Sequence, residues 1–96
     1  MECLEIIELR SSHKDYKILC EKLTGFLDDL NGEYENYTVK LYRHLTVETD
    51  WSFHIQIQTE INFKSPSQLG LRIASALQEF GLVHHSVWSE FLGEEE

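Results

Sequence analysis

Strict alternation of apolar and polar residues in the middle of the chain constrains the fold more than any other feature. In residues 51–58, WSFHIQIQ, aromatic or aliphatic side chains alternate with serine, histidine and glutamine. A period of two indicates a strand with one face in the core. The preceding residues 37–47, YTVKLYRHLTV, have a similar character, and the short segment Glu48-Thr49-Asp50 separates the two runs. We therefore predict a β-hairpin from Tyr37 to Thr59.

The length of the hairpin loop determines which residues face each other. If residues 48–50 form the loop, Val47 lies opposite Trp51 and His44 lies opposite His54. Arg43 then falls on the core side, so we expect it near a sheet edge with its head in water. The core face of the first strand would hold Val39, Leu41 and Leu45. The open face would be mixed aromatic and polar, with Lys40, Tyr42, His44, His54, Gln56 and Gln58.

A strand and a helix are expected before the hairpin. Residues 3–9, CLEIIEL, have Leu4 and Ile6 on one side and further apolar residues on the other, which is typical of a central strand buried on both faces. Helical spacing of apolar residues follows, and Ser12 with Asp15 resembles a capping box. We predict a helix at about 13–30, in which Gly25 marks close packing on the sheet.

A second helix and a last strand are expected after the hairpin. Ser65 is a natural N-cap with Pro66 at the first helical position, and Gly81 is expected as a left-handed C-cap, which predicts a helix at about 66–80. Gly70 within it allows close approach to the sheet. Residues 82–92, LVHHSVWSEFL, then form a strand with Val83, Val87 and Phe91 on one face.

The order strand, helix, strand, strand, helix, strand predicts a ferredoxin-like βαββαβ fold in the α+β class. In this arrangement both helices cover one face of a four-stranded antiparallel sheet. Residues 1–96 are expected to form this single domain. The fold hosts many unrelated activities and does not by itself indicate one.

Composition and charge limit the classes of binding partner and the cellular compartment that we expect for this chain. Seventeen acidic and eight basic residues give a net charge of −9, which repels phosphate backbones and anionic lipid surfaces. We therefore expect neither nucleic acid nor membrane as a partner. The first residues, MECLEIIELR, lack the basic and long apolar regions of a secretory signal, so a cytoplasmic location is expected. Cys3 and Cys20 are then expected to be reduced thiols.

The hairpin also resembles a known family. Leu41-Tyr42-Arg43-His44, followed by an acidic turn and Trp51-Ser52-Phe53-His54, is similar to the second and third strands of antibiotic-biosynthesis-monooxygenase-like proteins. The resemblance implies a dimeric α/β barrel, in which the open sheet faces of two copies pack together around a pocket. It also implies an oxygenase-like enzyme acting on a small organic molecule without a cofactor. Trp88 and Asn62 are the residues nearest in type to the tryptophan and asparagine found in the pockets of that family.

The open face carries the candidate site residues. His44 and His54, if directly opposite, have Cβ atoms about 5 Å apart and form a candidate catalytic pair that handles protons. Repulsion between two charged imidazoles would lower the pKa of at least one. The expected substrate-binding residues are Tyr42, Gln56, His84 and Trp88. A metal site would need a further ligand such as His84, so we predict none. The alternative is a pair of solvated or interface histidines.

Two functions remain open on sequence grounds. The first is an oxygenase-like enzyme with a pocket on the open face, and the second is a non-catalytic ligand-binding or dimerisation module. Both include a homodimer, because an apolar face left uncovered by helices would expose more apolar surface than a monomer usually tolerates. A cavity of several hundred Å³ ringed by polar groups would favour the first function, and a dry, fully packed face would favour the second.

Overall fold

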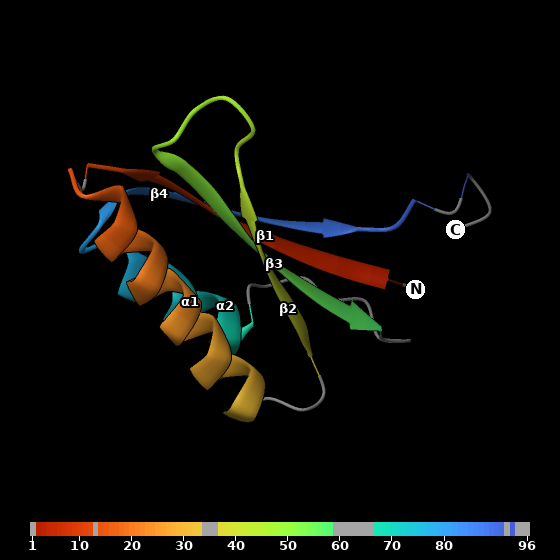
Figure 1. The fold of residues 1–96 in the computed structure, drawn as a ribbon. Coiled ribbons are helices and arrows are strands. Elements are labelled where there is room, and N and C mark those ends of the chain that lie inside the picture. The colour runs from red at the N-terminus through yellow and green to blue at the C-terminus, as the bar shows by residue number, and fades with distance from the viewer. Residues whose placement is uncertain (1, 13, 34–36, 59–66, 92, 94–96) are drawn as a thin grey trace.

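The chain folds into one antiparallel sheet with two helices packed against it (Figure 1). The computed structural model describes residues 2–12, 14–33, 37–58, 67–91 and 93. The elements are β1 (Glu2–Ser11), α1 (Tyr16–Glu33), β2 (Thr38–Arg43), β3 (Asp50–Gln58), α2 (Gln68–Leu77) and β4 (Gly81–Ser89). The strand order is β2-β3-β1-β4, which confirms the predicted ferredoxin-like fold.

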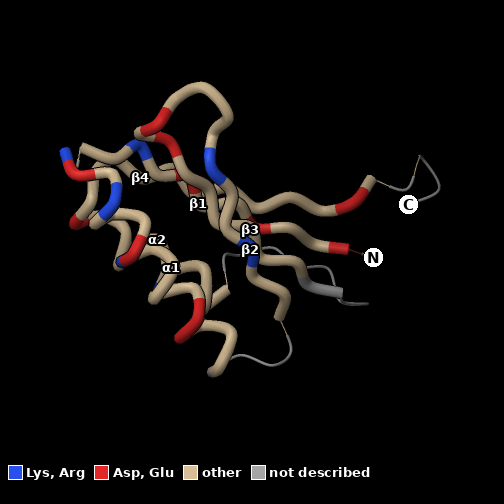
Figure 2. The backbone as a smooth tube through the Cα atoms, in the orientation of Figure 1, with Lys and Arg blue, Asp and Glu red and all other residues tan. Residues whose placement is uncertain are grey.

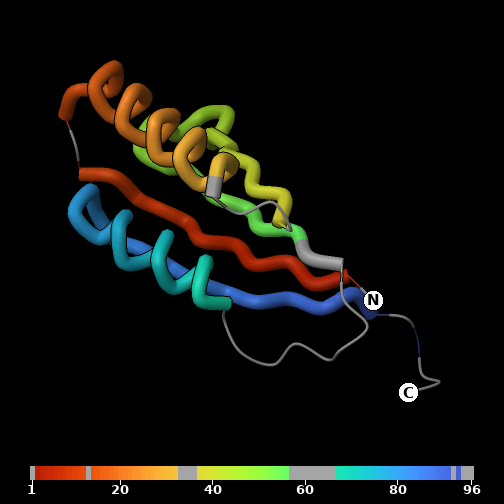
Figure 3. Tube along the Cα trace, turned by 90° about the horizontal axis from the view of Figure 1, so that it is seen from below, coloured from red at the N-terminus to blue at the C-terminus, as the bar shows by residue number. Residues whose placement is uncertain are grey.

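Both helices lie on the same side of the sheet, as the view turned by 90° shows (Figure 3). The core lies between them and the sheet and consists mainly of aliphatic side chains with Phe53 at its centre. β1 is central, as predicted: Ile7 and Leu9 are buried under the helices, whereas Leu4 and Ile6 are half-buried on the open face. None of the described helices has the length and apolar character needed to cross a membrane.

α1 begins and ends three residues later than predicted. Its first turn is capped by Asp15, whose carboxylate accepts the backbone N–H of Ile18 at 3.2 Å. Ser12 has a different role, because its N–H donates to the carbonyl of Phe80 at 2.9 Å. Gly25 does not mark a close approach, since a Cβ built there would meet nothing within 4 Å. Cys20, also on α1, is a free thiol, as is Cys3 on β1.

α2 is shorter than predicted at both ends. Ser67 is its N-cap and accepts the N–H of Gly70 at 2.9 Å, while the predicted cap Ser65 and Pro66 lie outside the described residues. The helix ends at Leu77, and its C-cap Gln78 is right-handed. Gly81 is therefore not the C-cap but the first residue of β4, where a Cβ would collide with the backbone of Arg10.

The hairpin register differs from the predicted one by four residues. Arg43, not Val47, pairs with Trp51, and His54 pairs with Lys40 instead of His44. The connection covers 44–49 because the His44 side chain forms a turn: its Nδ1 accepts the N–H groups of Thr46 and Val47 at 3.2 and 3.1 Å. An even shift keeps every strand residue on its predicted face but changes its partner. Leu45, predicted in the core, is 94% exposed in this loop.

Two further side chains test the expected faces. Arg43 lies on the edge strand β2, as predicted, and its Nη1 donates to the hydroxyl of Tyr16 at 2.6 Å. This hydrogen bond raises the pKa of the Arg43 guanidinium. β4 ends at Ser89, so Phe91 leaves the predicted core face and is 80% exposed, while Leu92 lies outside the described residues.

Candidate functional site

The strand registers align the open-face side chains in rows that run across all four strands. One row contains Tyr42, Ser52, Glu8 and His84 on β2, β3, β1 and β4, respectively. The row nearer the hairpin loop contains Asp50, Arg10 and Leu82. Two further rows lie farther from the hairpin loop. The nearer one contains Lys40, His54, Ile6 and Ser86, and the farther one contains Thr38, Gln56, Leu4 and Trp88. Position in these rows determines which residues share a site.

A cavity of about 480 Å³ lies over the first two rows, beside the hairpin loop. Its polar lining comes from Glu8, Arg10, Tyr42, Arg43, His44, Asp50, Ser52 and His84, with Leu82 among its apolar members. Its size falls within the range of small-molecule sites, and its lining combines aromatic, hydroxyl, acidic and basic groups. On sequence grounds, a cavity of this size with polar groups around it favours a ligand pocket over a dry, fully packed face.

An ion pair forms one wall of this cavity. Arg10 contacts Asp50 through Nε and Nη2, each 3.4 Å from a carboxylate oxygen, and the Thr49 hydroxyl donates to Asp50 at 3.0 Å. Partial desolvation raises the pKa of Asp50, but the hydrogen bonds from Arg10 and Thr49 together outweigh it and hold this pKa below its usual range. Because the Arg10 side chain is 72% exposed, the pair orients the wall more than it stabilises the fold.

Ser52 lies between Tyr42 and Glu8 in the row that ends at His84. Its Oγ is buried, and it has no hydrogen-bond partner within the described part of the chain. Buried hydroxyls in proteins are almost always paired, and a hydroxyl can both donate and accept. Ser52 Oγ and the indole N–H of the neighbouring Trp51 are thus two buried polar groups beside the cavity that have no partner in the described part of the chain.

The prediction that His44 lies directly opposite His54 is wrong. His44 lies in the hairpin loop with its Nδ1 bonded to the loop backbone, and His54 lies two rows from the loop. His54 instead contacts Tyr42, with ring centroids 4.3 Å apart and planes tilted by 41°. Burial lowers the pKa of His54, and the nearby Glu8 carboxylate offsets part of that effect. The pKa is lowered, as expected of the pair, but the cause is desolvation and not a second imidazole.

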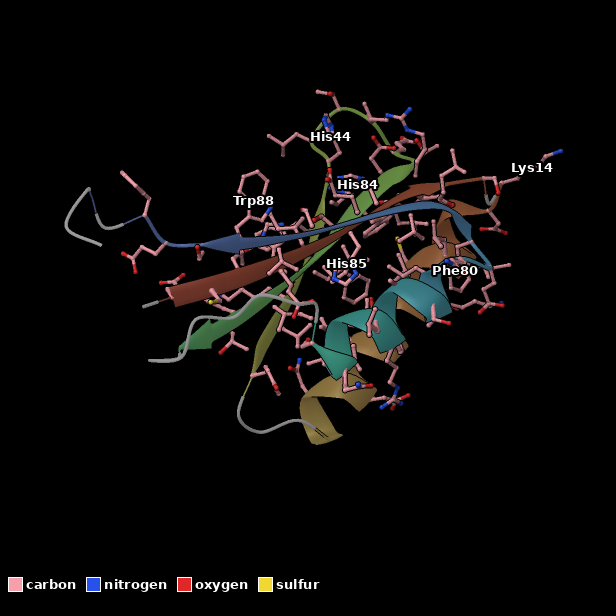
Figure 4. All side chains as sticks on the ribbon, turned by 180° about the vertical axis from the view of Figure 1, so that it is seen from behind. Lys14, His44, Phe80, His84, His85 and Trp88 are labelled. Carbon is pink, nitrogen blue, oxygen red and sulfur yellow. The ribbon has the colours of Figure 1, made fainter. Side chains whose placement is uncertain are left out.

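The structure separates the predicted site residues into two groups. Tyr42, His44 and His84 line the cavity, and His54 is linked to it through Tyr42. Gln56 and Trp88 share a more distant row and do not line it. Gln56 donates to Glu2 at 2.7 Å, and the Trp88 indole N–H donates to Ser86 at 2.9 Å. Figure 4 shows His44, His84 and Trp88 on the side of the sheet away from the helices.

Sequence reasoning missed Glu8, Arg10, Asp50 and Ser52, which also line the cavity. A signal for two of them was present, since Glu8 and Arg10 continue the alternation that placed Leu4 and Ile6 on the open face. The alternation places Ser52 on the open face, but the length of the hairpin loop decides which residues lie next to it. Residue types alone do not reveal that length.

A second polar cluster lies on the opposite face, under α2. Glu5 on β1 is fully buried among core residues, and its carboxylate accepts the backbone N–H of Ser67 at 2.9 Å. Its other oxygen is 2.8 Å from Nε2 of His85, which points toward α2 (Figure 4). A negative charge at a helix N-terminus is favourable, so this cluster anchors α2 to the sheet. Glu5 lies on the same face of β1 as Ile7 and Leu9. A single acid among apolar residues does not reveal from sequence that it is buried.

Other features do not extend the site. Within the residues that the structure describes, no three His, Cys, Asp or Glu side chains are grouped to hold a metal ion.

Comparison of the chain with protein-family models, with curated proteins and with solved structures gave no match. The resemblance of the hairpin to monooxygenase-like proteins therefore stays a prediction.

Proposed function

We propose that the protein binds a small organic molecule in the open-face cavity and acts as a homodimer whose second copy covers that face. The cavity of about 480 Å³ beside the hairpin loop carries this proposal. A face that served only for packing would not need a polar row of Tyr42, Ser52, Glu8 and His84 across its centre. These groups need bonding partners once a second copy excludes water, and a ligand supplies them.

The lining favours a planar molecule with at least one polar substituent. Tyr42 is 45% exposed and supplies a stacking surface, while the Ser52 hydroxyl, buried at the floor, bonds a polar substituent once the side chains above it shift. Glu8 and His84 continue the same row and can accept or donate protons. A phenol or an aromatic acid combines these features in a molecule of suitable size.

The homodimer is supported by the apolar groups that the helices leave uncovered. Trp88 is 59% exposed and Leu82 is 76% exposed on the open face, with Leu4 and Ile6 half-buried between them. Packing two such faces removes this surface from water. We expect light scattering at micromolar concentration to give a mass of at least two chains and Trp88→Glu to shift it toward the monomer. A monomer mass for the unaltered chain would contradict the homodimer.

Fragment binding tests the cavity itself. Backbone amide shifts in the presence of a panel of phenols and aromatic carboxylates should converge on Tyr42, Ser52 and His84. Ser52→Leu fills the cavity floor and should abolish these shifts, because it removes both the space and the hydroxyl. Thr38→Leu, an exposed substitution on the same face outside the cavity, is the matched control and should bind like the unaltered chain. Shifts that are absent, or centred elsewhere, would overturn the proposal.

Catalysis by the same cavity stays a prediction that rests on the family resemblance. Glu8 and His84 are among the lining groups that can remove a proton from a bound phenol. Oxygen uptake measured with each fragment that binds would show whether oxygenation follows. Binding without turnover would identify the chain as a non-catalytic module.

A further inference from the structure

β4 is an edge strand without the usual protection against pairing. Its nine residues, GLVHHSVWS, pair with β1 on one side, and no strand within the described ranges pairs with the other side (Figure 3). It contains no Asp, Glu, Lys, Arg or Pro, and its ladder with β1 runs without a bulge (Figure 2). Charges, prolines, bulges and short length are the features that normally prevent edge strands from pairing.

The opposite edge of the sheet is different. β2 has only six residues, and it carries Lys40 and Arg43. In a chain with 26% charged residues, an uncharged nine-residue edge is a distinct feature of β4. Two copies of a chain with a net charge of −9 repel each other, so a neutral strand is where their backbones can approach with the least repulsion.

The flanking hydrogen bonds identify which backbone groups of β4 point outward. The N–H of Ser12 donates to Phe80, and the N–H of Glu90 donates to Glu2, so residues 80 and 90 point their backbone groups toward β1. Backbone direction alternates along an antiparallel strand. The N–H and C=O groups of Val83, His85 and Val87 therefore point away from the sheet, and these groups are available to another strand.

We propose that β4 pairs in antiparallel fashion with β4 of a second copy, about a two-fold axis at His85. In this register Val83 and the partner's Val87 are hydrogen-bonded opposite each other, as are His85 and the partner's His85. All nine residues of both strands are paired, from Gly81 against the partner's Ser89 onward. A two-fold contact needs a self-complementary surface, and this register provides one.

The side chains support the same register. On the open face Leu82 meets the partner's Trp88, which covers two of the most exposed apolar side chains of the sheet. His84 meets the partner's Ser86, a pair that can share a hydrogen bond. A shift by two residues leaves the strand ends unpaired and places Trp88 against His84 or Leu82 against Ser86, so the full-length register is favoured.

Edge pairing extends the sheet to eight strands. On the open face it engages Leu82 and His84, which form the β4 wall of the cavity, and it leaves Tyr42, Ser52 and Glu8 uncovered. It is therefore a separate contact from the face packing proposed above and does not depend on it. Where both contacts form, every chain has two partners, so the assembly is larger than a dimer. Tyr42→Glu, on the strand farthest from β4, should weaken only the face contact, whereas Trp88→Glu should weaken both.

Amide hydrogen exchange of the unaltered chain tests the edge contact. The amides of Val83, His85 and Val87 should be protected, and their exchange should slow with rising protein concentration. Once most chains are paired, the unpaired fraction falls with the square root of concentration, so a hundredfold increase should slow exchange roughly tenfold. The amides of His84 and Ser86, which point toward β1, are internal controls that should be protected at every concentration.

A proline substitution provides the second test. Val87→Pro removes one outward N–H, and proline is compatible with an edge strand where that group does not bond within the sheet. It should abolish the concentration-dependent protection of Val83. Val87→Ala trims the side chain but retains the N–H, so it should keep that protection. Fast exchange of Val83, His85 and Val87 in the unaltered chain at all concentrations would overturn the proposal, however the proline variant folds.

Discussion

The two faces of the sheet differ in what holds their side chains in place. On the face toward the helices, Ile7, Phe53 and Ile55 are fully buried, and the buried carboxylate of Glu5 is bonded to His85 and to the backbone of Ser67. On the open face, Tyr42, His84 and Trp88 are exposed, and the buried Ser52 hydroxyl has no partner in the described part of the chain. The first face is covered by the two helices of the same chain, whereas the second is left uncovered by them, and we propose that a ligand and another copy occupy it.

The largest expected effect is the loss of a central core side chain. Phe53 is fully buried and contacts the Phe26 ring edge-on at 5.9 Å, so Phe53→Ala should lower the free energy of unfolding by about 3–5 kcal/mol. Tyr42→Ala, on the open face, should cost less than about 1 kcal/mol in the isolated chain. Urea denaturation of both variants checks this contrast. Equal losses would show that the open face is also part of the core.

Removal of the buried carboxylate should have the next largest effect. Glu5→Ala leaves the Ser67 N–H and the His85 ring without their partner, so we expect a loss of about 3 kcal/mol. Glu5→Gln keeps an acceptor oxygen for the Ser67 N–H and should cost less. A double-mutant cycle with His85→Ala separates the contact with His85 from the contact with α2. Additive losses would mean that the Glu5–His85 contact contributes nothing.

Two of the helix glycines, Gly70 and Gly25, should respond to alanine in opposite directions. A Cβ at Gly70 would meet the Glu5 carboxylate and the His85 ring, so Gly70→Ala should destabilise by about 1–3 kcal/mol. Gly25, also inside a helix, has open space at its Cβ position, so Gly25→Ala should stabilise by about 0.5–1 kcal/mol through helix propensity. Thermal melts of the two variants provide the comparison. Stabilisation by both would show that the Glu5 cluster adapts to the added methyl group.

The smallest expected effect is the pH dependence from His54. Burial lowers the pKa of His54 in the folded protein below its unfolded value of about 6.5. As pH falls through that value the unfolded chain binds the proton first, so stability declines and then levels off below the folded pKa. His54→Gln should remove this part of the decline between pH 8 and pH 5, measured by denaturation at each pH. An unchanged pH profile in the variant would assign the decline to other groups.

The sequence by itself determined the element order, the fold class and the face on which each described strand residue lies, apart from those that fell in the loop. Local signals were enough here: the run of residues 3–9, apolar on both faces, identified β1 as a central strand, and the alternation in the hairpin placed Arg43 near an edge. Only the tertiary structure decided the partners across the sheet, because the backbone turn that His44 forms sets the loop length, and a four-residue shift leaves the apolar pattern intact. That shift separated His44 from His54 and brought Tyr42 opposite Ser52. The cavity and the Glu5 cluster depend on such long-range pairings, which residues distant in sequence make only after the sheet has formed.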